Sequence, residues 1–308
     1  MTEQPKRGFP KRDIDGILLL DKPIGVSSNG ALQQAKRIFG ARKAGHTGSL
    51  DVLATGLLPI CFGEATKVCA FLLDTDKQYA ADIQLGSATT TGDSEGEVVR
   101  RGSTSAVNGA AIEHALAAFR GEIQQVPPMF SALKRGGQPL YKLARQGIEV
   151  EREPRTVTIY QLKLTGQSGD VISVEVSCSK GTYIRTLAEG IGDVLECGAH
   201  VSSLRRLGAG PYTIDHALSL DDLSEIADSA DPHIELDKRL LATDSALESL
   251  PGIYLTDESA FNVKRGQAVE VPDAPRAGLV RLYRSERQFI GVGAVLDDGR
   301  IAPRRLMR

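Results

Sequence analysis

The sequence lacks long apolar runs, paired cysteines and a net positive charge. No apolar stretch approaches the roughly 18 residues that suggest a membrane-spanning helix, so we expect no membrane partner. Residues 1–15 are polar and basic, without the apolar centre of a signal peptide. This favours a flexible basic tail over residues 1–13 and a cytoplasmic protein. The composition, 41% hydrophobic and 25% charged, is typical of globular proteins.

The cysteines form no C-x-x-C pair, and no histidine stands at zinc-ligand spacing from them. They are Cys61, Cys69, Cys178 and Cys197. Reduced, mostly buried thiols are the simplest interpretation. We therefore expect no metal site.

The net charge of −2 argues against a general nucleic-acid binder, but the charge is unevenly distributed. Residues 215–249 contain ten acidic and two basic side chains, so the rest of the chain carries +6. The basic residues occur in clusters at Arg37, Arg42 and Lys43; at Lys134, Arg135, Lys142 and Arg145; at Arg205 and Arg206; and at Arg304, Arg305 and Arg308. Each cluster alone is typical of a solvated face, but together they permit a phosphate-binding surface.

Hydrophobic periodicity predicts an α+β fold. The expected strands are residues 16–20, 79–85, 157–164 and 171–178, and the expected helices are residues 27–40, 64–73, 108–119 and 182–195. Residues 126–154 are rich in proline and glycine, which predicts a loop-rich insertion. The acidic residues 215–249 are expected to form two helices. Short apolar runs separated by turns predict a small all-β barrel at residues 251–308, after a main domain at residues 14–250.

The loop at residues 45–51 (GHTGSLD) carries two glycines, two hydroxyl residues and one histidine before a single carboxylate, Asp51. Such a loop can bring backbone close to a ligand and hold one acid at its end. It can equally be a tight turn in which the aspartate caps the next segment. Spacing alone leaves both interpretations open.

Several motifs, in order along the chain, resemble those of the TruB-type tRNA pseudouridine synthases. The central motif is residues 45–51, followed by LATG at 53–56 and GEATK at 63–67. The others are DKPxG at 21–25, KQY at 77–79, PPxxSAxK at 127–134, LY at 140–141, ARQG at 144–147, GTYIR at 181–185, LRRL at 204–207 and APRR at 302–305. The resemblance extends from about residue 14 to the end of the sequence.

This resemblance implies a pseudouridine synthase fold, in which a mixed, largely antiparallel sheet is flanked by helices. Residues 251–308 would form a PUA-like RNA-binding barrel, and residues 126–154 would grip RNA. The implied activity is that of an isomerase, which flips uridine 55 out of the tRNA T stem-loop and converts it to pseudouridine. The family needs neither a metal nor another cofactor, and we expect a monomer.

By resemblance, Asp51 is the nucleophile, Arg185 is its partner, and Tyr79 stacks on the target base. An exposed aspartate has a pKa near 3.9 and is already ionised at pH 7. Arg185 would therefore mainly offset the desolvation of the carboxylate and fix its direction. From the pattern alone, Arg185 would be a surface residue in the first turn of a helix, and Tyr79 a core residue.

The resemblance assigns further residues to substrate binding. They are His46, which would contact RNA near the flipped nucleotide; Lys22, Lys134 and Arg145, which would contact phosphates; and Tyr183 and Leu204, which would shape the uracil pocket. Asp93 either binds RNA or is an acidic turn residue. Val52 stands where the family usually has proline, which removes one backbone restraint from the loop.

Two other functions remain as alternatives. A non-catalytic tRNA-folding or RNA-binding protein could share the scaffold, but the presence of Asp51, Tyr79 and Arg185 argues against it. A guide-dependent synthase of the related dyskerin type would modify ribosomal RNA together with partner proteins. Activity of the purified chain on a bare T stem-loop would exclude the second alternative.

Overall fold

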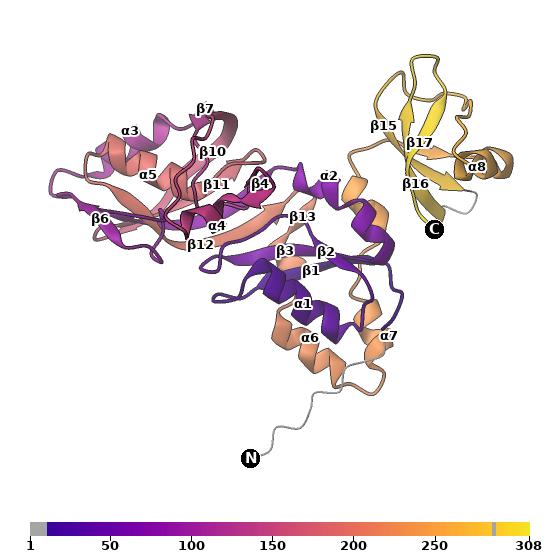
Figure 1. Cartoon of the computed structure of the whole chain (residues 1–308), viewed down its shortest axis with the longest axis horizontal. Helices are drawn as coiled ribbons and strands as arrows, with labels where there is room; N and C mark the ends of the chain where they lie inside the picture. The colour runs from indigo at the N-terminus through magenta and orange to yellow at the C-terminus, as the bar shows by residue number, and fades with distance from the viewer. Residues whose placement is uncertain (1–10, 285–287) are drawn as a thin grey trace.

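A computed structural model describes residues 11–284 and 288–308 of the protein (Figure 1). Most of the expected N-terminal tail, residues 1–10, lies outside the described residues. Within the described part of the chain, no helix combines the length and the apolar character that crossing a membrane requires.

A nine-stranded sheet forms the centre of the molecule. Its path runs β1-β3-β12-β4-β11-β10-β7, and β2 and β13 add to β3 and β12. The strands are β1 (Gly16–Lys22), β2 (Ala44–His46), β3 (Thr55–Phe62), β4 (Lys77–Leu85), β7 (Gly121–Gln125), β10 (Arg155–Ser168), β11 (Val171–Cys178), β12 (Ala199–Ala209) and β13 (Tyr212–Thr213). Among these described strands, β12 and β3 alone pair in parallel. The predicted α+β class and the mixed, largely antiparallel sheet are confirmed.

Strand β12 joins the two halves of this sheet. It pairs antiparallel with β4, where Arg206 faces Tyr79, and parallel with β3, where Arg206 faces Gly56. Gly56 has a φ of +100°, and a Cβ there would lie 2.3 Å from the Arg206 carbonyl oxygen. Only glycine fits this close approach of two backbones. Residues 204–206 are thereby brought next to the strand that follows the GHTGSLD loop.

Helices pack against the sheet on both of its halves. Helix α1 (Ser28–Ile38) covers β1 and β3, while α3 (Gly109–Ala117) and α5 (Ile184–Val194) cover β4, β10 and β11 (Figure 1). The caps are those expected of such sequences: Ser27 accepts from the Gly30 N–H and Asn108 from the Ala111 N–H, both at 3.0 Å.

The prediction of one continuous helix at residues 64–73 is wrong, because this segment is divided into two pieces. It consists of a 3-10 turn, η1 (Gly63–Lys67), followed by the short helix α2 (Cys69–Leu73). The Val68 N–H donates to the Ala65 carbonyl, three residues back, at 3.1 Å. This bond closes a 3-10 turn and separates the two pieces.

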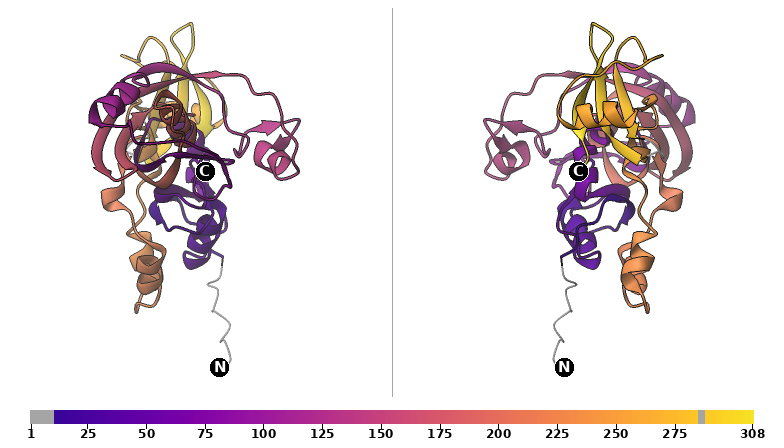
Figure 2. Two further views of the ribbon diagram at one scale, coloured as in Figure 1. Left: turned by 90° about the vertical axis from the view of Figure 1, so that its left-hand side faces the viewer. Right: turned by 90° about the vertical axis from the view of Figure 1, so that its right-hand side faces the viewer.

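The acidic segment and the insertion both form the kinds of structure that were expected. Residues 215–249 contain two α-helices, α6 (Leu220–Ala227) and α7 (Pro232–Asp237), and two 3-10 turns, η2 (Ile214–His216) and η3 (Thr243–Leu247). Residues 126–154 contain only the short strands β8 (Lys134–Arg135) and β9 (Gln138–Pro139) and the helix α4 (Leu140–Ala144). Figure 2 shows this insertion as an arm that projects away from the body of the molecule. A smaller hairpin pairs β5 (Ser87–Thr89) with β6 (Val98–Arg101).

The C-terminal segment is an open four-stranded sheet with one helix. Its strands, in order, are β14 (Gly252–Tyr254), β15 (Leu279–Arg284), β16 (Gln288–Val295) and β17 (Ile301–Leu306), and its helix is α8 (Asp257–Lys264). The predicted closed, all-β barrel is therefore wrong. Thr256 caps α8 by accepting from the Ser259 N–H at 3.2 Å, and Val263 is fully buried against the sheet. The apolar run at residues 268–271 contributes a single bridge, from Val269 to Ile301.

The C-terminal segment docks on the main domain. Val292 of β16 is fully buried in a cluster with Ile17 and Val68 of the main domain. The Lys67 ammonium donates to the Leu306 carbonyl at 2.7 Å, close to the end of β17. These contacts place the C-terminal sheet beside η1, which follows β3.

Replacement of Leu18 by alanine tests the packing of the core. Leu18 lies in β1, is fully buried and packs against α1 and β3. Because the substitution leaves a void, Leu18→Ala should lower the free energy of unfolding by about 2–5 kcal/mol in urea titrations. The control is Ile234→Ala, at a residue that is 58% exposed, and it should cost less than about 0.5 kcal/mol. Equal effects of the two substitutions would contradict the described core.

Candidate active site

The loop that carries Asp51 is fixed by the first turn of α1. The buried Ser28 hydroxyl accepts from the Leu50 N–H at 2.7 Å and donates to the Leu50 carbonyl at 3.0 Å. On the other side of Asp51, the Gly25 N–H donates to the Val52 carbonyl at 2.9 Å. These bonds hold the residues on both sides of Asp51, and its side chain remains 44% exposed.

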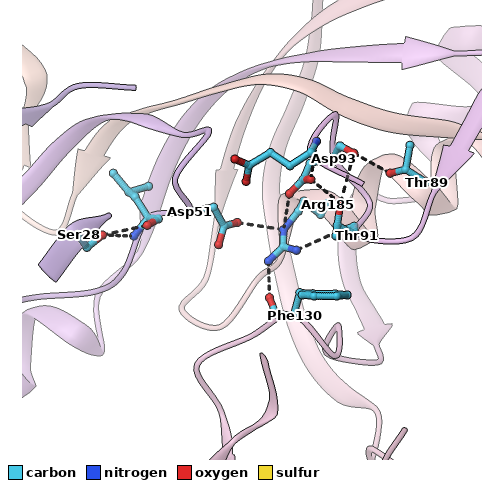
Figure 3. A network of polar contacts seen from close by, with 9 residues as sticks. Ser28, Asp51, Thr89, Thr91, Asp93, Phe130 and Arg185 are labelled. Atoms are coloured by element: carbon cyan, nitrogen blue, oxygen red, sulfur yellow. Dashed lines mark hydrogen bonds and ion pairs between the residues drawn. The ribbon is translucent and has the colours of Figure 1, made fainter. Parts of the chain in front are cut away.

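Arg185 meets Asp51 from the first turn of α5, as Figure 3 shows. The Arg185 Nε lies 3.0 Å from the Asp51 Oδ2, and its side chain is only 6% exposed. The other two nitrogens donate to the Thr91 carbonyl at 2.9 Å and the Phe130 carbonyl at 2.7 Å. Every nitrogen of the guanidinium is thus engaged, which fixes its plane. The interpretation of Arg185 as a surface arginine is wrong.

Asp93 supports this network from behind Arg185. It is 3% exposed, and its Oδ2 lies 3.7 Å from the Arg185 Nε. Its Oδ1 accepts from the Thr91 hydroxyl at 2.5 Å and from the Glu95 N–H at 3.1 Å. Both carboxylate oxygens of Asp93 have partners inside the protein. Its two expected roles, RNA contact or acidic turn residue, stay predictions.

Opposing effects act on the pKa of Asp51. Burial of the carboxyl group raises its pKa above the usual value, and the charge of Asp93 acts in the same direction. The cations of Arg185 and Lys22 lower the pKa and favour the ionised form. Arg185 therefore both orients the carboxylate and offsets its desolvation.

Lys22 lies inside the protein. Its side chain is fully buried, and its ammonium donates to the Pro23 carbonyl at 2.8 Å and to the Val26 carbonyl at 2.6 Å. Burial lowers the pKa of Lys22 to about 8, and the neighbouring charge of Arg206 also lowers it. The predicted phosphate contact of Lys22 is wrong, because no part of the ammonium reaches the surface.

Tyr79 and His46 face the same buried cation, Arg206. Tyr79 is partly buried on β4, and burial raises its pKa while the adjoining Arg206 lowers it. His46 is half-buried on β2, with a pKa lowered by burial and by Arg206. Both side chains are therefore uncharged at pH 7.

The remaining predicted residues lie in two places. Tyr183 precedes α5 and is held by Gln125, whose side-chain oxygen accepts from the Tyr183 N–H at 3.0 Å. Leu204 is 8% exposed on β12 and packs in the same cluster as Leu50. Lys134 and Arg145 are exposed, and both lie in residues 126–154, which form the projecting arm.

Arg206 was grouped with Arg205 as a surface cluster, and this was wrong. Arg206 is 1% exposed and donates through Nε to the Leu57 carbonyl at 2.7 Å. Arg205 pairs with both carboxylate oxygens of Asp21, at 3.0 and 2.6 Å. The signal in the sequence was the spacing of Leu204 and Arg206, because alternate residues of a strand share one face.

Models of three TruB domains match most of the sequence. The N-terminal domain of TruB family pseudouridylate synthases matches residues 36–184. The C-terminal domain of tRNA pseudouridylate synthase B matches residues 185–248. The C-terminal domain of pseudouridine synthase II TruB matches residues 251–307.

Curated proteins resemble the chain over nearly its whole length. A protein of Pseudomonas syringae pv. syringae (strain B728a) named tRNA pseudouridine synthase B is 54% identical over 97% of each chain. A protein of the same name from Aeromonas salmonicida (strain A449) is 51% identical over 98% of this chain and 97% of its own. The chain belongs to the TruB family.

A solved structure has a similar fold. The crystal structure of a Cbf5-Nop10-Gar1 complex contains a chain that is 27% identical, with a TM-score of 0.73. The alignment covers 95% of this chain and 84% of that one. The fold of this chain is therefore similar to that of the chain in the Cbf5-Nop10-Gar1 complex.

Titration of the buried Lys22 gives a testable pH dependence. Its pKa is about 8 in the folded protein, against 10.5 for an ordinary lysine. Between these values the unfolded chain binds more protons, so the free energy of unfolding rises with pH. Lys22→Met should reduce this rise, measured in urea between pH 8 and 9.5, by up to about 1.4 kcal/mol per pH unit. The control Lys163→Met, at an exposed lysine, should keep the wild-type slope, and an unchanged slope in Lys22→Met would refute the assignment.

Proposed function

We propose that the chain is a tRNA pseudouridine synthase that isomerises uridine 55 of the T arm, with Asp51 as its nucleophile. The observation that carries the proposal is the pairing of a partly exposed Asp51 with an almost fully buried Arg185. This chemistry needs a carboxylate that a nucleotide can reach and that is held in one orientation. Asp51 is partly exposed, and Arg185 orients it. The names of the curated relatives support tRNA as the substrate.

The reaction breaks the bond between C1′ of the ribose and N1 of uracil, rotates the base, and joins C1′ to C5. The C5 proton is lost and N1 gains a proton, so substrate and product are isomers. A carboxylate can form a covalent intermediate with the sugar or the base. Asp51 attacks either C1′ or the base ring, and both routes begin from the ionised carboxylate that Arg185 favours.

Tyr79 would stack on the flipped uracil, a contact worth roughly 1–3 kcal/mol. Since burial raises the pKa of its hydroxyl, the phenol is neutral at pH 7. A neutral phenol is a poor base, which favours stacking over removal of the C5 proton. Tyr183 and Leu204 would line the uracil site. The carboxylate, the ring and these two side chains would together hold the nucleotide.

RNA would be held by the projecting arm. Lys134 and Arg145 are exposed there, and the Arg145 guanidinium lies 5.7 Å from the ring centre of Tyr141. Flipping a base costs a few kcal/mol, which phosphate contacts by the arm and contacts by His46 would offset. The C-terminal sheet would bind RNA as a PUA-like domain. We infer a cytoplasmic monomer that acts on the T stem-loop alone.

The dyskerin-type alternative is less well supported. The similar chain that is solved in complex with partner proteins, Nop10 and Gar1, is 27% identical, whereas the curated proteins named tRNA pseudouridine synthase B reach 54% over 97% of the chain. The purified chain should therefore act on a bare T stem-loop, without guide RNA or partner proteins. Failure on a bare T stem-loop, together with activity in a guide-RNA complex, would favour the alternative.

Tritium release from C5-labelled uridine in tRNA tests Asp51 directly. Asp51→Asn removes the nucleophile and should lower release by at least about 10³-fold, while gel-shift titrations show unchanged tRNA binding. Asp74→Asn is the matched control, because Asp74 is exposed and pairs with Lys180, and its release should equal wild type. A non-catalytic RNA-binding protein would release no tritium even as wild type. Full activity of Asp51→Asn would contradict the proposed nucleophile.

A further inference from the structure

Arg206 is a buried cation with neutral partners. It is 1% exposed, and its Nε and Nη2 donate to the carbonyls of Leu57 and Gly48, at 2.7 and 3.3 Å. Tyr79 lies directly opposite Arg206 on the neighbouring strand β4, and the charge of Arg206 lowers the pKa of the Tyr79 hydroxyl, against the larger effect of burial, which raises it. In the described part of the chain, no carboxylate pairs with it. A buried charge without a counter-charge is costly, so its presence beside a reactive site calls for an explanation.

The three partners of Arg206 belong to three parts of the proposed site. Gly48 lies in the loop that carries Asp51, Leu57 lies in the buried part of β3, and Tyr79 faces Arg206 from β4. Arg206 and Tyr79 are directly opposite on antiparallel strands, so their side chains leave the same face of the sheet. One rigid guanidinium therefore bridges the loop of the nucleophile and the strand of the stacking ring.

We propose that Arg206 is a positioning residue for the reaction, whose guanidinium holds the Tyr79 hydroxyl and the Gly48 carbonyl together. It thereby sets the separation between the ring that stacks on uracil and the loop that carries Asp51. A lysine cannot replace it, because a single ammonium lacks the planar fork that reaches several acceptors in fixed directions. This inference rests on the proposed function of the site.

A purely structural role for Arg206 makes a different prediction. Loss of its bond to Leu57 would lower stability and would slow the reaction independently of Tyr79. A positioning role acts through the Tyr79 hydroxyl. In a chain that already lacks this hydroxyl, replacing Arg206 should therefore cause little further loss of rate. A double-mutant cycle on the rate separates the two roles.

The cycle uses Arg206→Lys, Tyr79→Phe and the double variant of the full chain. Single-turnover rates on a T stem-loop, with enzyme in excess, report the chemical step. We expect each single variant to be slower by about tenfold, because misplaced groups react slowly, and the double variant to lie within about twofold of the slower single variant. Affinity for the T stem-loop should change by less than about threefold. The proposal would be overturned if the rate loss of the double variant equals the product of the two single losses. It would also be overturned if Arg206→Lys reacts at the wild-type rate.

Arg205→Met is the matched control. Arg205 is the neighbouring arginine on β12, its side chain is 40% exposed, and it pairs with Asp21. Its loss should change the single-turnover rate by less than about twofold, and a loss as large as that of Arg206→Lys would overturn the specific role of Arg206. If Arg206→Lys shows no cooperative thermal unfolding, Arg206→Gln takes its place with the same criteria. A wild-type rate in Tyr79→Phe would overturn the proposal with either variant.

These outcomes are distinct from failure of the proposed function. A wild-type chain that does not turn over the T stem-loop would contradict the function itself. A wild-type chain that turns it over, with Arg206 variants of equal rate, would contradict only the role of Arg206.

Discussion

The contact between the Arg185 guanidinium and the Asp51 carboxylate is the interaction on which the site depends. Arg185 is bonded at once to the loop of Asp51, to the turn containing Thr91 and to the base of the arm at Phe130. These three segments are far apart in sequence, and a single buried side chain fixes them relative to one another. A movement of the arm at Phe130 would therefore displace the guanidinium that contacts Asp51.

The same interaction explains why basic groups are buried around Asp51, beside which a second acid, Asp93, is also buried. A carboxylate that loses its hydration needs nearby positive charge to remain ionised. Arg185 supplies this charge by contact, and Lys22 lies close enough to lower the pKa of Asp51 as well. Burial, and after it the charge of Arg206, lowers the pKa of His46. Burial of these cations is unfavourable for folding, but it surrounds the Asp51 carboxylate with the positive charge that keeps it ionised.

Much of the fold was predictable, because local patterns and tertiary packing agree there. The alternation at residues 171–178 predicted β11 to the residue, and the Asn108 cap marked the start of α3. The C-terminal helix α8 was missed, since its amphipathic pattern is weak and it becomes helical by packing Ala260 and Val263 on the sheet. A sheet closes into a barrel only if its two edge strands pair with each other. Short apolar runs in the sequence do not predict which strands pair.

The chemistry was predictable from motifs, but the environment of each side chain was not. Periodicity alone placed Arg185 on the surface, and the resemblance to a family paired it with Asp51, as the structure does. Lys22 and Arg206 were expected at the surface because lysine and arginine are rarely buried. Their burial depends on carbonyl oxygens of Val26 and Leu57, which become acceptors only in the folded chain.

A structure of the Asp51→Asn chain bound to an unmodified T stem-loop tests the role of Asp51 most directly. Uridine 55 should be flipped out, with its C1′ or its ring in contact with residue 51, its base stacked on Tyr79, and the Arg185 side chain still bonded to the Phe130 carbonyl. A target uridine that stays stacked in the loop, or that binds away from residue 51, would contradict this role.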